Sequence, residues 1–311
     1  MQPQLQTQTS NELNRTTGWK VWWKLTRPHT LTAAFVPVFI GTALARLEAT
    51  INIPLFIAML AACLVIQIAT NMINEYYDYK RGLDHAGSVG IGGAIVRDGI
   101  KPSTVLRLAF ILFGFAVLLG IYICLHSNWW IALIGTICML AGYLYTGGPV
   151  PIAYTPFGEV VAGIFMGLII ILISFYIQTG EVTTSSVMLS IPIAILVGAI
   201  LMANNIRDLD GDKENGRKTL AILLGRKNAV RFLGLMFVVA YLWMITLSFT
   251  AYAPLSVLLV LISIPKAVHA IKGFIGKTIP IQMAPAMKAT AQTNTIYGLL
   301  LSIGLFISYW L

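Results

Sequence analysis

The chain has 311 residues, of which 57% are hydrophobic and only 11% are charged, and its mean hydropathy is +0.80. Soluble domains carry about 25% charged residues, so this composition excludes an ordinary soluble globule, and it also excludes a disordered chain. The net charge of +9 is compatible with a nucleic-acid partner, but the positions of the basic residues, described below, argue against that partner.

The chain begins with a polar segment, residues 1–19, which lacks the apolar run of a signal peptide. We expect this segment to be a flexible cytoplasmic tail, followed by one transmembrane domain over residues 20–311. The three cysteines lie in apolar runs without a C-x-x-C pair. The sequence therefore predicts buried thiols rather than a zinc or redox site.

Nine apolar runs follow, and each is a candidate membrane-spanning helix, which needs about 17–25 mostly apolar residues. The runs cover residues 29–45, 51–73, 108–125, 129–144, 160–177, 187–203, 232–252, 254–268 and 293–310. The eighth run is the weakest because Lys266 interrupts it. The predicted fold class is an all-α integral membrane protein with nine transmembrane helices in one bundle.

The basic residues follow the membrane topology. All of the 21 lysines and arginines except Arg46 lie in the N-terminal segment or beside the loops after the second, sixth and eighth runs. The positive-inside rule makes these loops cytoplasmic, with the N-terminus inside and the C-terminus outside. We therefore expect a multi-pass protein of the cell (plasma) membrane, contacting membrane lipid and no nucleic acid.

Two acidic stretches, residues 69–84 and 202–220, leave predicted helices on the cytoplasmic side. In each stretch, polar residues are spaced to share one helix face. They are Asn71, Asn74 and Asp78 in the first stretch, and Asn204, Asp208 and Asp212 in the second. Gly82 is expected to end the helix that carries the first acidic stretch, which places Asp84 on the loop that follows.

Both stretches contain the pattern N-x-x-x-D, and the two copies lie 130 residues and four predicted helices apart. The copies therefore have the same orientation, which indicates an internal parallel repeat of four helices plus one extra helix. A single copy is typical of a solvated helix end. The duplication favours a functional site between the two halves.

Carboxylates on one helix face repel each other, so two such faces near a membrane predict a cation between them. Oxygen ligands favour Mg²⁺, which takes one or two carboxylates plus substrate phosphates. Basic residues nearby are candidates for binding the remaining phosphate oxygens of a diphosphate. They are Lys80, Arg81, Arg97, Arg217 and Lys218. For Lys80 and Arg81 the alternative is a topology anchor, and for Asn71 it is a contact between helices.

At these residues the chain resembles the UbiA-type intramembrane prenyltransferases, over nearly all of residues 24–311. The resemblance implies Mg²⁺-dependent ionisation of an isoprenyl diphosphate and alkylation of an aromatic acceptor. Carried over residue by residue, it implies a set of metal ligands, three of which are also catalytic. The ligands are Asn74, Asp78, Asp84, Asn204, Asp208 and Asp212, and the catalytic residues are Asp78, Asp208 and Asp212.

Further segments resemble the branch of this family that acts on 1,4-dihydroxy-2-naphthoate in menaquinone synthesis. They are TRPHTL, NEYYDYKRGLD, GGAIVRDG, YLYTGGPVPIAY and GRKTLA. The implied reaction transfers a polyprenyl group from polyprenyl diphosphate with decarboxylation, giving demethylmenaquinone and diphosphate. The R-T-x-x-R-P run of relatives that use 4-hydroxybenzoate is absent, and the Y-x-x-x-K loop of other relatives has no lysine here.

The expected substrate-binding residues lie in or near these segments. They are Arg27, Asn71, Asn74, Lys80, Arg97, Tyr143, Tyr145, Asn204, Arg217 and Lys218. Arg27 enters the first helix and is the candidate for the acceptor carboxylate. The two tyrosines are candidates for cation–π stabilisation of the allylic cation, with an interfacial aromatic belt as the alternative.

Other possibilities remain open at this stage. The YTGGPVP turn is either a shaped loop over the pocket mouth or a tight helix connection. The alternative functions are prenyl transfer to another aromatic acid, such as 4-hydroxybenzoate, and membrane transport, since transporters also carry intramembrane carboxylates and repeats. The acids lie at one face rather than at the midplane, which favours the enzyme.

Overall fold

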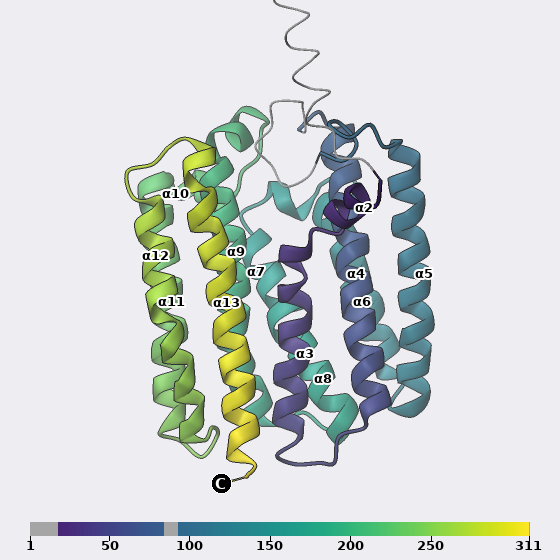
Figure 1. Cartoon of the computed structure of the whole chain (residues 1–311), viewed down its shortest axis with the longest axis vertical. Helices are drawn as coiled ribbons and strands as arrows, with labels where there is room; N and C mark the ends of the chain where they lie inside the picture. Colours follow the sequence, from purple (N-terminus) through teal and green to yellow (C-terminus); the bar gives the residue numbers. More distant parts are fainter. Residues whose placement is uncertain (1–17, 84–92, 311) are drawn as a thin grey trace, which may run out of the picture.

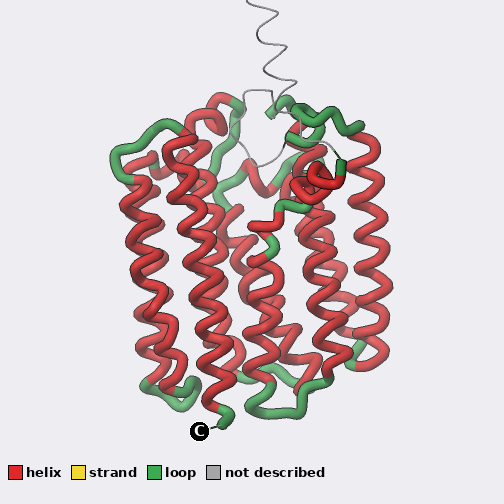
Figure 2. The backbone as a smooth tube through the Cα atoms, viewed as in Figure 1, coloured by secondary structure: helices red, strands yellow, loops and turns green. Residues whose placement is uncertain are grey.

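The computed structural model describes residues 18–83 and 93–310, and every regular element in these ranges is a helix. The long helices run side by side along one direction, as Figures 1 and 2 show. Helix α2 (Trp19–Leu25) lies at the opposite end of the bundle from the C-terminus of α13 (Pro280–Ser308). We call the end that holds α2 the site end. The predicted all-α class is confirmed, whereas the predicted tail lies almost entirely outside the described residues.

The remaining elements follow in chain order. They are η1 (Pro28–Thr30), α3 (Thr32–Ala45), α4 (Ile53–Lys80), α5 (Pro102–His126), α6 (Trp130–Thr146), η2 (Ile152–Tyr154), α7 (Gly158–Ala162), η3 (Gly163–Ile169), α8 (Ile170–Thr179), α9 (Thr184–Glu214), α10 (Leu220–Leu224), α11 (Arg226–Ser248), η4 (Leu255–Ser263) and α12 (Ile264–Phe274). By length and apolar composition, six segments of the described chain can cross a membrane, and the apolar helices α3 and α6 are shorter. The count of nine spanning helices therefore stays a prediction.

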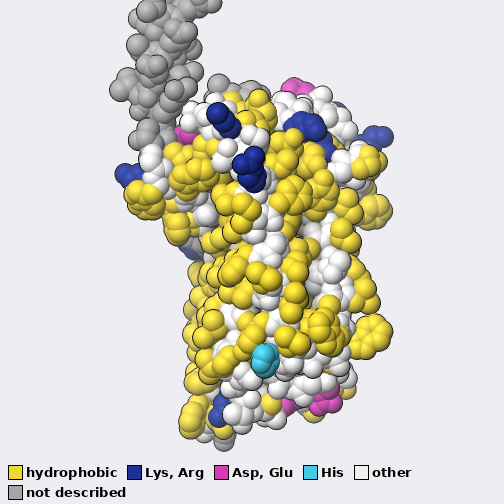
Figure 3. Space-filling view, turned by 90° about the vertical axis from the view of Figure 1, so that its right-hand side faces the viewer, with side chains coloured by type: hydrophobic (Ala, Val, Ile, Leu, Met, Phe, Trp, Pro, Cys, Tyr) yellow, Lys and Arg dark blue, Asp and Glu magenta, His cyan; other side chains and the backbone are white. Residues whose placement is uncertain are grey.

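The outer surface of the bundle is apolar. Large side chains such as Leu118 on α5, Leu140 on α6 and Leu242 on α11 are exposed. Figure 3 shows one face on which hydrophobic side chains cover the middle, while lysines and arginines gather mainly toward the site end. Such a band, too large for a soluble monomer, is the surface that a bilayer covers.

Helix α4 extends well past its predicted apolar run. The Asn52 side chain caps its start by accepting a hydrogen bond from the Leu55 N–H at 3.2 Å. Gly82, with a φ of 72°, follows its end, because glycine takes this left-handed conformation without steric cost. The prediction that Gly82 ends this helix is confirmed, and Asp78 lies in the last turn.

Three predicted runs, the first, the fifth and the eighth, are not regular α-helices throughout. The first is preceded by Arg27 at a φ of 50°, unusual for a non-glycine residue, and α3 starts only at Thr32. The eighth begins as the 3₁₀ segment η4 and becomes α-helical near Pro265. Proline has no N–H to donate to the preceding turn, which accounts for a change of helix type at that position.

The fifth run contains a π-helical segment, η3, which lies directly against α9. A Cβ on Gly167 would be 2.4 Å from the Ala194 Cα, and one on Gly163 would be 2.5 Å from the Ala194 carbonyl oxygen. The two glycines therefore allow the backbones to touch. This close packing fixes the fifth run against the helix that carries the second aspartate motif.

Candidate active site

The two motif helices, α4 and α9, both end at the site end, where Asp78 and Asp212 contact one guanidinium. The Arg217 Nη1 atom lies 3.0 Å from Asp212 Oδ1, and its Nη2 atom lies 3.4 Å from Asp78 Oδ1. All three side chains are mostly buried. Carboxylates from the two halves of the chain thus share one positive charge.

Arg217 is held in place by the turn that follows α9. Gly216 takes a φ of 75°, and the Arg217 guanidinium lies 4.9 Å from the centre of the Tyr154 ring. Burial lowers the pKa of Arg217, but the Asp212 and Asp78 carboxylates outweigh it and raise that pKa above its ordinary value. The guanidinium therefore remains charged between the two acids.

Asp208 is held differently from the other two aspartates. Its carboxylate accepts both Nε–H and Nη2–H of the adjacent Arg207, with Nε 2.7 Å from Oδ1. The Asp208 side chain is 39% exposed, against 11% for Asp212. Arg207 also contacts the Met287 sulfur of α13 at 2.8 Å. Asp208 therefore lies at the rim of the site rather than between the two motif helices.

The three asparagines have different surroundings. Asn71 is buried, and its amide donates to the Thr26 carbonyl and to Thr30 Oγ1, both at 2.9 Å. Asn71 thereby connects α4 to the segment before α3. This geometry supports the alternative role of Asn71, a contact between helices. Asn74 Oδ1 accepts a hydrogen bond from the Thr146 hydroxyl. Asn204 lines the central cavity.

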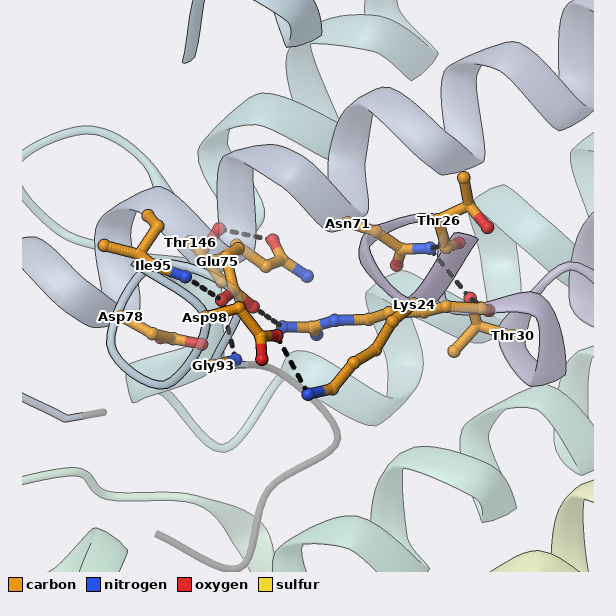
Figure 4. A network of polar contacts seen from close by, with 12 residues as sticks. Lys24, Thr26, Thr30, Asn71, Glu75, Asp78, Gly93, Ile95, Asp98 and Thr146 are labelled. Atoms are coloured by element: carbon orange, nitrogen blue, oxygen red, sulfur yellow. Dashed lines mark hydrogen bonds and ion pairs between the residues drawn. The ribbon is translucent and has the colours of Figure 1, made fainter. Parts of the chain in front are cut away.

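Glu75 is a site residue that the sequence analysis did not assign. It is 1% exposed, and its Oε2 accepts a hydrogen bond from Arg27 Nη2 at 3.0 Å. Its Oε1 accepts from the N–H of Gly93 at 2.6 Å and of Ile95 at 3.3 Å (Figure 4). The Arg27 guanidinium, expected to bind the acceptor, is thus already paired. The sequence did contain a signal for this contact. Glu75 directly follows Asn74, so it lies off the helix face shared by Asn71, Asn74 and Asp78 and could contact another element.

The segment that includes Gly93 returns to the bundle beside Glu75. Lys24 Nζ forms an ion pair with Asp98 at 3.0 Å, and the Asp98 side chain is fully buried (Figure 4). Arg97 packs over Gly93, where a Cβ would be 2.3 Å from its Nε. Arg97 thus lies near Glu75 and helps to shape this loop. Asp84 lies outside the described residues.

The second half of the chain contains a counterpart of the Glu75–Arg27 pair. Asn205 follows Asn204 as Glu75 follows Asn74, and its Nδ2 donates to Glu159 Oε1 at 2.8 Å. Glu159 lies just before the fifth run, as Arg27 lies just before the first. Its Oε2 is buried and has no hydrogen-bond partner among the described residues. The repeated architecture therefore extends to a polar contact in each half.

The loop between α6 and α7 is hydrogen-bonded by residues that directly follow each of the two motif helices. Arg81, just after α4, donates to the carbonyls of Thr146 and Gly148. The Lys218 N–H, after α9, donates to the Tyr154 carbonyl at 2.9 Å. This geometry is that of a shaped loop joining the two motifs at the site end, rather than of a tight helix connection.

The other expected substrate-binding side chains are spread around this centre. Lys80 and Lys218 are exposed, and Lys80 Nζ lies 6.0 Å from the Tyr76 ring centre rather than beside the aspartates. The Tyr143 hydroxyl is 2.7 Å from that of Tyr77. Tyr145 lines the cavity.

A cavity of about 990 Å³ lies inside the bundle, between all of the long helices except α11. Its polar lining includes Arg27, Asn71, Asn74 and Asn204, and most of the remaining wall is apolar. Its far part reaches Trp129, at the start of α6 away from the site end. This shape suits a long apolar chain with a polar head at the site end.

The oxygen donors at the site end are of the kind that Mg²⁺ prefers. Arg217 shows that one positive group can contact both Asp78 and Asp212. Within residues 18–83 and 93–310, no three His, Cys, Asp or Glu side chains form a group that could hold a metal. A cation at Asp78 and Asp212 would need its other ligands from elsewhere, such as substrate phosphates and water.

Comparisons with known proteins identify relatives along almost the whole chain. A 1,4-dihydroxy-2-naphthoate octaprenyltransferase of Bacillus subtilis is 60% identical over 291 residues, which cover 94% of each chain. UbiA prenyltransferase domain-containing protein 1 of Danio rerio is 30% identical over 286 residues, covering 91% of this chain and 82% of that protein.

Solved structures show the same fold. A UbiA homologue from Aeropyrum pernix has a TM-score of 0.67 at 16% identity, covering 89% of this chain and 97% of that one. A homologue from Archaeoglobus fulgidus, bound to DMAPP and Mg²⁺, has a TM-score of 0.62 at 15% identity, covering 90% and 98%. The UbiA prenyltransferase family model matches residues 34–275. The resemblance predicted from the aspartate motifs is confirmed, and this chain belongs to the UbiA prenyltransferase family.

Proposed function

We propose that this protein transfers a polyprenyl group from polyprenyl diphosphate to 1,4-dihydroxy-2-naphthoate, with loss of the carboxylate as CO₂ and release of diphosphate. The observation that carries the proposal is the meeting of Asp78 and Asp212 at one guanidinium, beside a large apolar cavity. The naphthoate acceptor follows from the name of the B. subtilis relative, which is 60% identical over nearly the whole chain.

The arrangement places the diphosphate head of the donor in a polar, hydrated region and its prenyl tail in an apolar cavity. The diphosphate head binds at the site end, where Asp78, Asp212 and Asp208, with Asn74 and Asn204, would hold Mg²⁺. A bound Mg²⁺ would supply Lewis-acid stabilisation of the charge on the departing diphosphate. Arg217 lies between the two motif helices and neutralises phosphate oxygens. The Archaeoglobus homologue holds DMAPP and Mg²⁺, which supports this assignment.

The cavity protects the reactive intermediate from water. The allylic C–O bond breaks with its electron pair on the diphosphate oxygen, and a ring carbon of the acceptor attacks the allylic carbon. Loss of CO₂ leaves the electron pair of the broken C–C bond in the ring, which balances the positive charge that the ring gained from the prenyl group. Aromaticity therefore returns with no net uptake or release of a proton, giving the prenylated naphthalenediol of the demethylmenaquinone skeleton. Apolar walls exclude water from the cation, and the Tyr145 ring in that wall offers a π face.

Product analysis with purified full-length protein tests this proposal. The protein receives Mg²⁺, prenyl diphosphates of several lengths, and equal concentrations of 1,4-dihydroxy-2-naphthoate and 4-hydroxybenzoate. Mass spectrometry is expected to detect a prenylated, decarboxylated naphthalenediol, and EDTA should abolish it. A predominant prenylated 4-hydroxybenzoate would reassign the acceptor, and Mg²⁺-independent turnover would contradict the metal.

We also propose nine spanning helices in the plasma membrane, with the site end in the cytoplasm. The support is the positive-inside pattern together with the exposed apolar band. Cysteines introduced at Lys277, beside the loop between α12 and α13, and at Thr250, beyond α11, give the test. In intact cells an impermeant maleimide should label only the Thr250→Cys protein, and labelling of Lys277→Cys alone would invert the topology.

A further inference from the structure

Two lysines line the central cavity away from the aspartates. Lys266 is on α12 and Lys288 is on the neighbouring helix α13. Lys266 lies eight residues before the last residue of α12, and Lys288 eight residues after the first residue of α13. At 1.5 Å per residue, both therefore lie about 12 Å inside the site end of their helices.

The cavity wall carries positive charge without balancing acids. Among the described residues, its charged lining side chains are Arg27, Lys266 and Lys288, and no described Asp or Glu lines it. Arg27 is paired with Glu75. Neither lysine forms an ion pair or side-chain hydrogen bond with any residue that the structure describes. Lys266 is half-buried and Lys288 is exposed, but both line a cavity within the apolar band of the bundle. A charge at such a depth is costly and marks a functional site, and an anion in the cavity would balance it.

The surroundings of the two lysines define the chemistry of that anion. On α13, Gln292 lies one turn beyond Lys288 and Thr295 follows, while Met287, Ala291 and Ile296 supply apolar wall. A carboxylate on a flat apolar body suits two ammonium groups, two hydrogen-bonding side chains and an apolar wall. The diphosphate has its own place, because Asp78, Asp212 and Arg217 do not line this cavity.

We propose that Lys266 and Lys288 bind the carboxylate of the aromatic acceptor and so select an aromatic acid over the corresponding carboxylate-free diol. This inference rests on the proposed function, because the acceptor is taken from it. It assigns the acceptor carboxylate to α12 and α13 in place of Arg27, whose charge Glu75 already neutralises. The acceptor ring then lies in the cavity, below the diphosphate at the site end.

A binding experiment separates this role from a structural one. Full-length protein in zwitterionic nanodiscs, without prenyl donor, is titrated anaerobically with 1,4-dihydroxy-2-naphthoate and with 1,4-dihydroxynaphthalene. The proteins are wild type, Lys266→Met, Lys288→Met, the double variant and Lys272→Met. Lys272 is the matched control, because it lies on α12 like Lys266 but does not line the cavity.

Wild type and Lys272→Met should bind the acid about tenfold or more tightly than the diol, the value expected for a charge-assisted contact. The double variant should bind both ligands equally, while its affinity for the prenyl diphosphate and its thermal stability stay at the wild-type level. The KM for the acid should rise and that for the diphosphate should not.

Other results would overturn the inference in distinguishable ways. Wild-type protein that does not bind the acid contradicts the proposed function and this inference together. A double variant that keeps the wild-type preference for the acid contradicts the inference alone. So does a rise only in the KM for the diphosphate, or an effect seen only in nanodiscs with phosphatidylglycerol, which would assign the ammonium groups to lipid headgroups.

Discussion

The two copies of the N-x-x-x-D pattern are alike in sequence but are held in different ways. In the first copy Asp78 contacts Arg217, a residue of the other half. In the second copy the corresponding residue, Asp208, pairs with its own neighbour Arg207, and Asp212, one turn further along, meets Asp78 through Arg217. The repeat therefore places equivalent helices together but does not give equivalent aspartates the same role.

A second difference concerns the polar contact that each half makes beside its motif. In the first half a carboxylate on the motif helix, Glu75, meets a cation, Arg27. In the second half an amide on the motif helix, Asn205, meets a carboxylate, Glu159. The first contact joins a buried carboxylate to a mostly buried guanidinium, and the second leaves a single acid held by a neutral group. Equivalent positions in the two halves therefore carry an ion pair in the first half and a charge–neutral hydrogen bond in the second.

The largest expected effect of a substitution is at the shared centre. Asp78→Asn and Asp212→Asn keep the side-chain shape but remove the charge that holds the cation, so kcat should fall by about 10³-fold or more in each. Turnover assays at saturating Mg²⁺ measure this, with gel filtration as the control for folding. Near-normal activity in either variant would show that the substituted aspartate does not hold the cation that binds the diphosphate.

Stability should distinguish the two polar contacts. Glu75→Gln leaves the Arg27 charge buried without its partner and should cost on the order of 3 kcal/mol, whereas Asn205→Ala removes a single hydrogen bond and should cost about 1–2 kcal/mol. Thermal unfolding in detergent compares them. The variant Glu75→Gln/Arg27→Gln should recover part of the loss, and equal costs for Glu75→Gln and Asn205→Ala would remove the distinction between the halves.

A smaller effect is expected at the rim. Asp208→Asn removes a carboxylate that is partly exposed and paired with Arg207, so the Mg²⁺ concentration for half-maximal rate should rise about tenfold, corresponding to one weakened charge-assisted contact. Initial rates over a Mg²⁺ series provide the measurement. An unchanged Mg²⁺ requirement would exclude Asp208 from the metal site.

The smallest effects are expected at the exposed lysines. Lys80→Met and Lys218→Met should change the KM for the prenyl diphosphate by less than about fivefold, as exposed charges interact weakly. Arg217→Met should raise it much more, because that guanidinium lies between the motif helices. If Lys80→Met equals Arg217→Met in this assay, the positive charge at the site end acts collectively and not through Arg217.

Local features of the fold and site could be predicted from the sequence. The end of α4 at Gly82 was predictable because glycine favours the required backbone conformation, and the family was predictable from the duplicated aspartates. The Glu75–Arg27 pair and the bridge by Arg217 were not, because they join residues 48 and 139 positions apart. Such contacts depend on how the helices pack, and no local spacing encodes that.

The most direct test of the shared centre is a double-variant cycle on cation binding. Mn²⁺, as a spectroscopic substitute for Mg²⁺, is titrated by electron paramagnetic resonance with a prenyl thiodiphosphate present. The proteins are wild type, Asp78→Asn, Asp212→Asn and the double variant. If the two motifs act on one diphosphate-bridged centre, each single variant should lose the tight binding and the double variant should be no weaker than the weaker single variant. Losses that multiply in the double variant would show two independent sites and contradict the account.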